Sequence, residues 1–173
     1  MAHYLESDHL VAAGDHFVLD PKRFDPVDPR PYATIDELAA GLSGYRGRGA
    51  TKARTALTLV RPGAESRMET LLRLLLLRAR LPEPDLNLDV FDADHKCLGR
   101  ADLVWPEFMT IAEYDGDQHR TSRSQYDRDI TRTENFVNAG WSDISVRARA
   151  FFNEPANVIY RVAEALRRGG WTP

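Results

Sequence analysis

Three carboxylates lie close together in two short segments of this 173-residue chain. Glu113 and Asp115 end the segment FMTIAEYD, and alternate residues of an extended strand share one face. Asp102 lies within LGRADLVW, between the apolar residues Ala101 and Leu103. A carboxylate in an apolar strand is costly unless it is paired or bound to a metal ion. The spacing therefore indicates a site that uses negative charge.

The two segments bring their carboxylates together if they pair as a hairpin, because Asp102 then faces Glu113. Two carboxylates and a backbone carbonyl form a hard oxygen site that suits Mg²⁺ or Mn²⁺. Such a metal activates water and stabilises the charge on a phosphorus atom during phosphodiester hydrolysis. Glu69, in the first turn of an earlier predicted helix, is a candidate for a further, water-mediated ligand.

Simpler interpretations of the same residues stay open. The carboxylates can pair with arginines such as Arg100 or Arg73, and Asp115-Gly116 is a dipeptide that often begins a turn. A lone histidine such as His119 is more typical of a surface turn, so its candidacy depends on the acids beside it. A zinc site of His and Asp lacks enough clear ligands.

Sequence patterns from residue 63 onward predict the helices and strands that position these residues. Ser66 and Glu69 form a capping box, and Gly140 is a candidate C-cap. Hydrophobic periodicity then predicts helices over about 66–79, 124–139 and 155–168, and strands over about 86–91, 98–105, 108–115 and 141–146.

This order predicts an α/β fold with a mixed four-stranded sheet flanked by helices. Short connections make the first three strands antiparallel, and a helical crossover makes the fourth strand parallel to its neighbour. Residues 1–62 predict a helical N-terminal extension, and residues 63–173 predict the domain that carries the site. The extension has expected helices at 9–18, 35–42 and 51–60, with Thr34 and Glu37 as a capping box and a proline-rich connector over 20–31.

Composition and charge limit the function classes. Hydrophobic residues make up 43% of the chain and charged residues 28%, which is typical of a globular protein. The absence of a long apolar run and of a signal-peptide pattern predicts a cytoplasmic protein with no membrane association. Cys97 is the single cysteine, and we expect a buried thiol there.

The charge is unevenly distributed. The chain has a net charge of −3, yet residues 44–80 contain nine basic and two acidic residues. A basic region beside an acidic cluster suits an anionic polymer that meets a metal site, although unrelated solvated helix faces give the same pattern. In the loop RGRGATKAR the candidate phosphate contacts are Arg46, Arg48, Lys52 and Arg54, and a solvated linker is the alternative.

The stretch RADLVWPEFMTIAEYDGDQHR, followed by YDRDITRTENFVNAGW and SVRA, resembles the relatives of very-short-patch-repair (Vsr) endonucleases within the PD-(D/E)xK superfamily. The resemblance covers about residues 63–171 and is specific because many short elements recur in order. The matched positions are Glu69, Arg73, Asp102, Glu113, Asp115, Gly116, His119, Asp127, Arg128, Asp129, Arg132, Gly140, Trp141 and Arg147.

The resemblance implies a restriction-endonuclease-like core and roles for individual residues. Asp102 and Glu113 would be metal ligands, with the Tyr114 carbonyl as a third. His119 would lie beside the scissile phosphate as a general acid or base, and Glu69 would support the metal through water. The superfamily's usual lysine is replaced here by Asp115, which the Vsr-like group commonly shows, and this leaves the group that activates water open.

Within the same resemblance, Arg73 and Arg128 join the loop residues as candidate nucleic-acid contacts. The implied activity is metal-dependent DNA hydrolysis, in repair or phage defence. The alternative is an inactive nuclease-fold module for DNA binding or regulation. The region before residue 63 resembles the middle of longer actinobacterial proteins labelled as type IV toxin–antitoxin (AbiEi-like) components, relative to which the start looks truncated. A double-strand cut needs two sites, which is compatible with a homodimer, whereas a nickase needs one.

Overall fold

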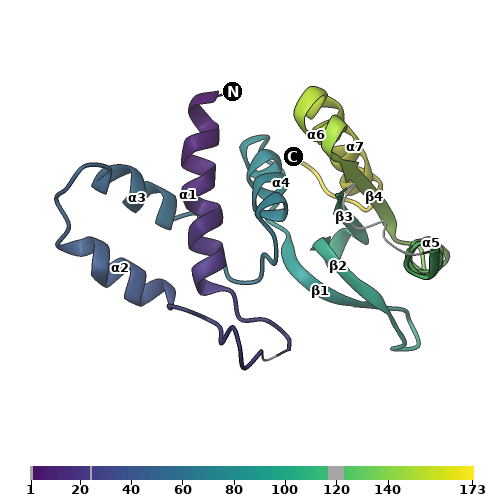
Figure 1. The fold of residues 1–173 in the computed structure, drawn as a ribbon. Helices are drawn as coiled ribbons and strands as arrows, with labels where there is room; N and C mark the ends of the chain where they lie inside the picture. Colours follow the sequence, from purple (N-terminus) through teal and green to yellow (C-terminus); the bar gives the residue numbers. More distant parts are fainter. Residues whose placement is uncertain (1, 24, 117–122) are drawn as a thin grey trace. The chain divides into compact units, whose positions relative to one another are not determined.

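The computed structural model describes the chain at residues 2–23, 25–116 and 123–173, and the side chains at 7–23, 25–116 and 131–173. The chain forms two compact units, Met1–Leu74 and Leu75–Pro173, which we call the first and second units. Figure 1 traces both along the sequence. None of the described helices has the length and apolar character that a bilayer span requires.

The first unit is helical, as predicted for the N-terminal part of the chain. Helix α3 packs against both α1 and α2. A small core of aliphatic side chains, including Val11, Val60 and Leu74, holds the unit together. Its helices are α1 (Ala2–Val18), α2 (Ile35–Ser43), α3 (Ala50–Leu57) and the first part of α4 (Arg67–Arg78).

The predicted capping box at the start of α2 is confirmed. The Glu37 backbone N–H donates to Thr34 Oγ1 at 3.2 Å, and the Thr34 N–H donates to the Glu37 carboxylate at 2.8 Å. These reciprocal bonds satisfy two backbone donors at the start of the helix. They also lower the pKa of Glu37, because the Thr34 backbone and hydroxyl both stabilise its charged form.

The boundary between the units lies within α4, later than the division at residues 62 and 63 that the sequence predicts. The reason is a buried carboxylate, Asp15 of α1. Its Oδ2 accepts hydrogen bonds from Arg73 Nη2 at 3.0 Å and Thr70 Oγ1 at 2.8 Å. Its Oδ1 accepts the Arg61 backbone N–H at 2.7 Å. These bonds tie the start of α4 to α1.

The second unit contains the predicted mixed four-stranded sheet. The strands lie in the order β1-β2-β3-β4 (Figure 1). The β1–β2 and β2–β3 pairs are antiparallel, and β3–β4 is parallel after the crossover through α5 (Arg123–Asn138). The strands are β1 (Asp85–Phe91), β2 (Cys97–Trp105), β3 (Thr110–Asp115) and β4 (Ser142–Arg147).

Helices cover both faces of this sheet. Phe136 of α5 packs with Val104 and Ile111 on one face. Tyr114 points to the opposite face, where its ring meets Phe151 edge-on at 6.3 Å between centroids. Phe151 belongs to α6 (Ala148–Asn153), and α7 (Pro155–Arg168) packs against α6, β3 and β4. The inner strands of the sheet, β3 above all, are therefore covered on both sides, whereas much of the edge strand β1 is exposed.

The C-terminal end of α5 is a Schellman motif. The Trp141 N–H donates to the Phe136 carbonyl at 3.0 Å, and the Gly140 N–H donates to the Val137 carbonyl at 2.9 Å. Gly140 has φ +88°, which glycine adopts without a steric cost. The predicted C-cap is thereby confirmed, and it directs the chain from α5 into β4.

Three further features differ from the sequence prediction. The short helix α6 and a 3₁₀ turn at Pro106–Phe108 lie where the sequence shows no periodicity, because segments this short contain fewer than two helical turns. Cys97 is exposed, so the prediction of a buried thiol is wrong. The residue begins β2 directly after the β1–β2 turn, where the strand is not yet covered by a helix.

Candidate functional site

The β2–β3 register brings the two central carboxylates together. Leu103 pairs with Ala112, and Val104 pairs with Ile111. Continued by one residue, this antiparallel register sets Asp102 opposite Glu113. Residues directly opposite in an antiparallel pair project to the same face. That face is the one that α5 covers, since it also carries Val104 and Ile111.

Asp102 is held at the point where the β2–β3 backbone pairing ends. Its Oδ2 accepts the backbone N–H of Tyr114 at 2.8 Å. A carboxylate that accepts a backbone N–H makes a strong, charge-assisted hydrogen bond. Asp102 therefore has a definite position beside the backbone of Tyr114, whose carbonyl is the predicted third ligand.

Glu113 is held by an arginine from α5. Its side chain is 12% exposed, and Oε2 accepts a hydrogen bond from Arg132 Nη2 at 3.1 Å. Arg132 Nη1 also donates to the Arg100 carbonyl on β2 at 2.9 Å. One guanidinium thus joins β2, β3 and α5 around the Glu113 carboxylate.

Gly99 leaves the space that Arg132 needs. A Cβ at this position would lie 2.8 Å from Arg132 Cδ and 2.9 Å from Cγ, which is closer than Cβ contacts normally occur. Gly99 also has φ +150°, a conformation that residues with a side chain rarely adopt. The glycine in LGRADLVW therefore has a structural role in placing Arg132 against Glu113.

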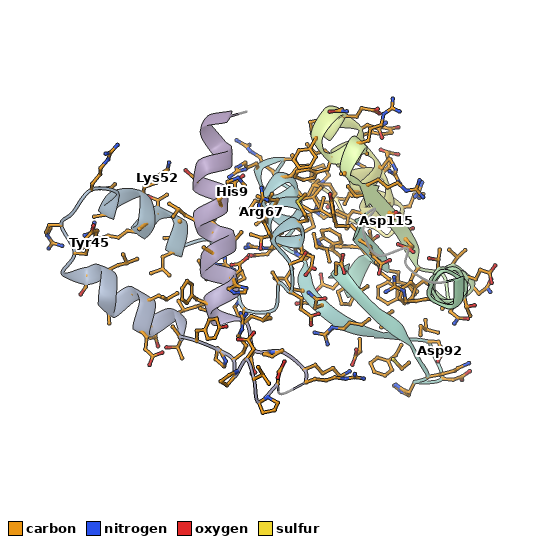
Figure 2. The ribbon with its side chains drawn as sticks, in the orientation of Figure 1. His9, Tyr45, Lys52, Arg67, Asp92 and Asp115 are labelled. Carbon is orange, nitrogen blue, oxygen red and sulfur yellow. The ribbon has the colours of Figure 1, made fainter. Side chains whose placement is uncertain are left out.

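Asp115 lies beside Arg147 at the ends of the two parallel strands. The β3–β4 register pairs the two residues, and Arg147 Nε donates to Asp115 Oδ2 at 3.2 Å. Figure 2 shows Asp115 in the second unit. The simpler interpretation expected these carboxylates to pair with arginines such as Arg100 or Arg73. Arginines do pair with two of them in the structure, namely Arg132 with Glu113 and Arg147 with Asp115.

The structure adds a carboxylate that the sequence analysis missed. Asp143 of β4 pairs with Ile111, so it lies on the same sheet face as Glu113. The pKa of Asp143 is raised overall, because burial disfavours the charged carboxylate. A hydrogen bond from Thr133 and the positive charge of Arg132 offset part of this rise. Among the described residues, Asp143 Oδ1 has no hydrogen-bond partner. In the sequence Asp143 alternates with Ser145 and Arg147, which is typical of a strand face that is exposed to solvent. Helix α5 packs on this face and partly buries Asp143.

These oxygen atoms suit a hard divalent cation better than zinc. Asp102 and Glu113 lie on adjacent strands of one face, with the Tyr114 peptide beside them. Within residues 7–23, 25–116 and 131–173, no three His, Cys, Asp or Glu side chains converge as a metal-binding group. The predicted set has two carboxylates and one backbone carbonyl, so its donors fit Mg²⁺ or Mn²⁺, with Arg132 holding Glu113 in place.

Glu69 caps a helix in the first unit. Its side chain is buried, its backbone N–H donates to Ser66 Oγ at 3.2 Å, and its Oε2 accepts the Glu65 N–H at 2.8 Å. The predicted capping box is therefore present in a variant form, because the carboxylate reaches Glu65 rather than Ser66. Its proposed support of a metal remains a prediction.

Arg73 corrects a predicted nucleic-acid contact. Its side chain is fully buried, and it donates to Asp15 Oδ2 and to the Leu59 carbonyl at 2.9 Å. A guanidinium in this position serves the packing of the first unit and does not meet a phosphate. The other predicted contacts at Arg46, Arg48, Lys52 and Arg54 lie on or beside α3. His119 and the side chain of Arg128 lie outside the described residues.

Two proteins of Mycobacterium tuberculosis are similar to this chain. They are Uncharacterized protein MT2308 of strain CDC 1551 / Oshkosh and Uncharacterized protein Rv2248 of strain ATCC 25618 / H37Rv, each 28% identical over 152 residues. The similarity covers 81% of this chain and 56% of each relative, so the chain spans little more than half of their length. No family model matches the chain, and no solved structure matches it significantly.

Proposed function

We propose that this chain is a Mg²⁺- or Mn²⁺-dependent endonuclease that hydrolyses phosphodiester bonds of DNA in the cytoplasm, in repair or phage defence. The observation that carries the proposal is the placement of Asp102 and Glu113 opposite each other on one partly buried sheet face. The order of short motifs that resembles Vsr-like nucleases supports the same site. Asp102, Glu113 and the Tyr114 carbonyl would hold the metal.

The chain's own residues contribute position and charge. Asp102 is oriented by the Tyr114 N–H, and Glu113 is oriented by Arg132. A bound divalent ion supplies a more acidic water and positive charge beside the phosphorus. Arg132 is thus a positioning residue, whereas Asp102 and Glu113 touch the reacting centre.

The test is cleavage of supercoiled plasmid by the full chain with Mg²⁺ or Mn²⁺. We expect nicking by the wild type and its loss, by at least about 100-fold, in Glu113→Gln, because the metal site loses a charged ligand. The matched control is Glu164→Gln on α7, a partly exposed residue paired with Arg167. Cleavage by Glu113→Gln at the wild-type rate would exclude this site.

A second candidate function is a DNA-binding or regulatory module without catalysis, such as a toxin–antitoxin component. The observations that favour it are the ion pair between Glu113 and Arg132 and the presence of Asp115 where the superfamily usually has lysine. Thermal unfolding with Mn²⁺ separates the two functions, since a ligand that binds the folded state raises the unfolding temperature. An active site predicts a rise that Asp102→Asn abolishes, and the regulatory module predicts equal behaviour of both proteins.

A further inference from the structure

The turn between α2 and α3 presents an aromatic ring within a basic surface. The ring belongs to Tyr45, whose side chain is 49% exposed. Figure 2 shows Tyr45 in the connection between the two helices, with Lys52 on α3. We call residues 43–54, which comprise the connection between α2 and α3 and the first part of α3, the Tyr45 turn.

The Tyr45 ring lies against the backbone of its own turn. A Cβ on Gly47 would lie 2.3 Å from the Tyr45 hydroxyl oxygen and 2.7 Å from ring atom Cε2, so the ring packs directly on the glycine backbone. The Tyr45 carbonyl accepts a hydrogen bond from Arg54 Nη2 at 2.5 Å. An aromatic side chain held in this way loses little conformational entropy when a flat ligand stacks on it.

The sequence on either side of Tyr45 carries charge of a single sign. No Asp or Glu occurs from Leu38 to Ala64, whereas this stretch contains five basic residues. Arg46 and Arg54 are partly used within the turn, since Arg46 donates to the Ser43 carbonyl at 2.7 Å. Arg48 is exposed beside the ring. Such a surface complements a flexible polyanion that also has flat apolar faces.

We propose that the Tyr45 turn binds single-stranded DNA, with an unpaired base stacked on Tyr45 and backbone phosphates on Arg48, Arg46 and Lys52. In a duplex the faces of the bases are covered by their neighbours, so a protruding ring distinguishes single strands from double strands. The inference rests on the proposed function, because it names the form of DNA that the nuclease receives. It assigns a role to Tyr45, which phosphate contact alone does not use.

The test measures binding of a fluorescein-labelled oligothymidine of about 15 nucleotides by anisotropy, in EDTA, with the full chain. We expect tighter binding to this strand than to a duplex of equal length. Tyr45→Ala should weaken binding about tenfold, whereas Tyr45→Phe, which keeps the ring, should stay within about twofold. The matched control is Tyr160→Ala on α7, where a more exposed ring, at 62%, lies outside this surface.

A second variant keeps the test informative if Tyr45→Ala fails to fold. Arg48→Ala alters an exposed side chain, and we expect it to reduce the slope of log affinity against log salt by about 0.7. Unchanged affinity in Tyr45→Ala, equal affinity for duplex, or equal competition by polyglutamate would overturn the proposal. EDTA prevents metal-dependent cleavage during the binding measurement. Tyr45-dependent binding by a chain that cleaves neither plasmid nor single-stranded DNA once Mg²⁺ or Mn²⁺ is added would reject the nuclease and retain this inference.

Discussion

At the scale of single residues, the most informative group is the partly buried carboxylate of Asp143. Burial raises the pKa of Asp143, so its carboxyl group binds a proton more tightly in the folded chain than in the unfolded chain. The sign follows from linkage: the contribution of Asp143 to stability is complete below its ordinary pKa of 3.8 and is lost as the pH rises through the raised value.

We therefore predict that Asp143→Asn increases the free energy of unfolding at about pH 7, and that this advantage shrinks as the pH falls toward about 4. The asparagine keeps an oxygen for the Thr133 hydrogen bond and removes the buried charge. Urea denaturation at a series of pH values measures the effect. Lower stability of the variant at neutral pH would show that the charge is stabilised by Arg132 more than burial disfavours it.

Arg73 is the residue whose loss should damage the first unit most. Removing one partner of a buried ion pair leaves the other charge uncompensated, at a cost of about 3–5 kcal/mol. We predict this loss for Arg73→Met, because Asp15 would remain buried without its positively charged partner. The control on the same helix is Arg67→Met, an exposed residue, which should change stability by less than about 1 kcal/mol. Similar losses in both variants would contradict the buried pair as the cause.

At the scale of elements, the second unit depends on a close approach between the end of α7 and the turn after β2. A Cβ on Gly169 would lie 2.1 Å from the Phe108 carbonyl oxygen. Since that atom belongs to the backbone, it cannot rotate away. We predict that Gly169→Ala destabilises the chain by about 1–3 kcal/mol.

The matched comparison for this substitution is Gly41→Ala. Gly41 lies within α2, and a Cβ there meets nothing within 4 Å. Alanine is a better helix former than glycine by about 1 kcal/mol, so we expect this variant to be more stable than the wild type. Chemical denaturation of both variants gives the result, and a neutral Gly169→Ala would refute the predicted clash.

At the scale of the whole molecule, the two units have separate cores. Val11, Val60 and Leu74 belong to the first, and Ile111 and Phe136 belong to the second. We predict that Phe136→Ala, at a cost of about 3–5 kcal/mol, raises amide hydrogen exchange in peptides from the sheet of the second unit. Peptides from α1 and α3 should keep their protection. Equal loss of protection across the chain would show that the units unfold as one.

The sequence by itself determined the local structure of this protein. Helix and strand periodicity, the capping box at Thr34 and Glu37, and the C-cap at Gly140 depend on residues only a few positions apart. The same local patterns predicted the mixed sheet and the opposition of Asp102 and Glu113, because a short connection leaves little choice of register.

Only the tertiary structure decided which polar residues are buried and what they bind. Arg73 is buried in an ion pair with Asp15, although the two residues are far apart in sequence. Helix α5 partly buries Asp143, for which the sequence pattern predicts exposure to solvent. The same helix places Arg132 beside Glu113. Which polar side chains are buried or paired depends on which helices and strands pack together. The free energy of that packing comes from many contacts between residues far apart in sequence, which a local pattern does not contain.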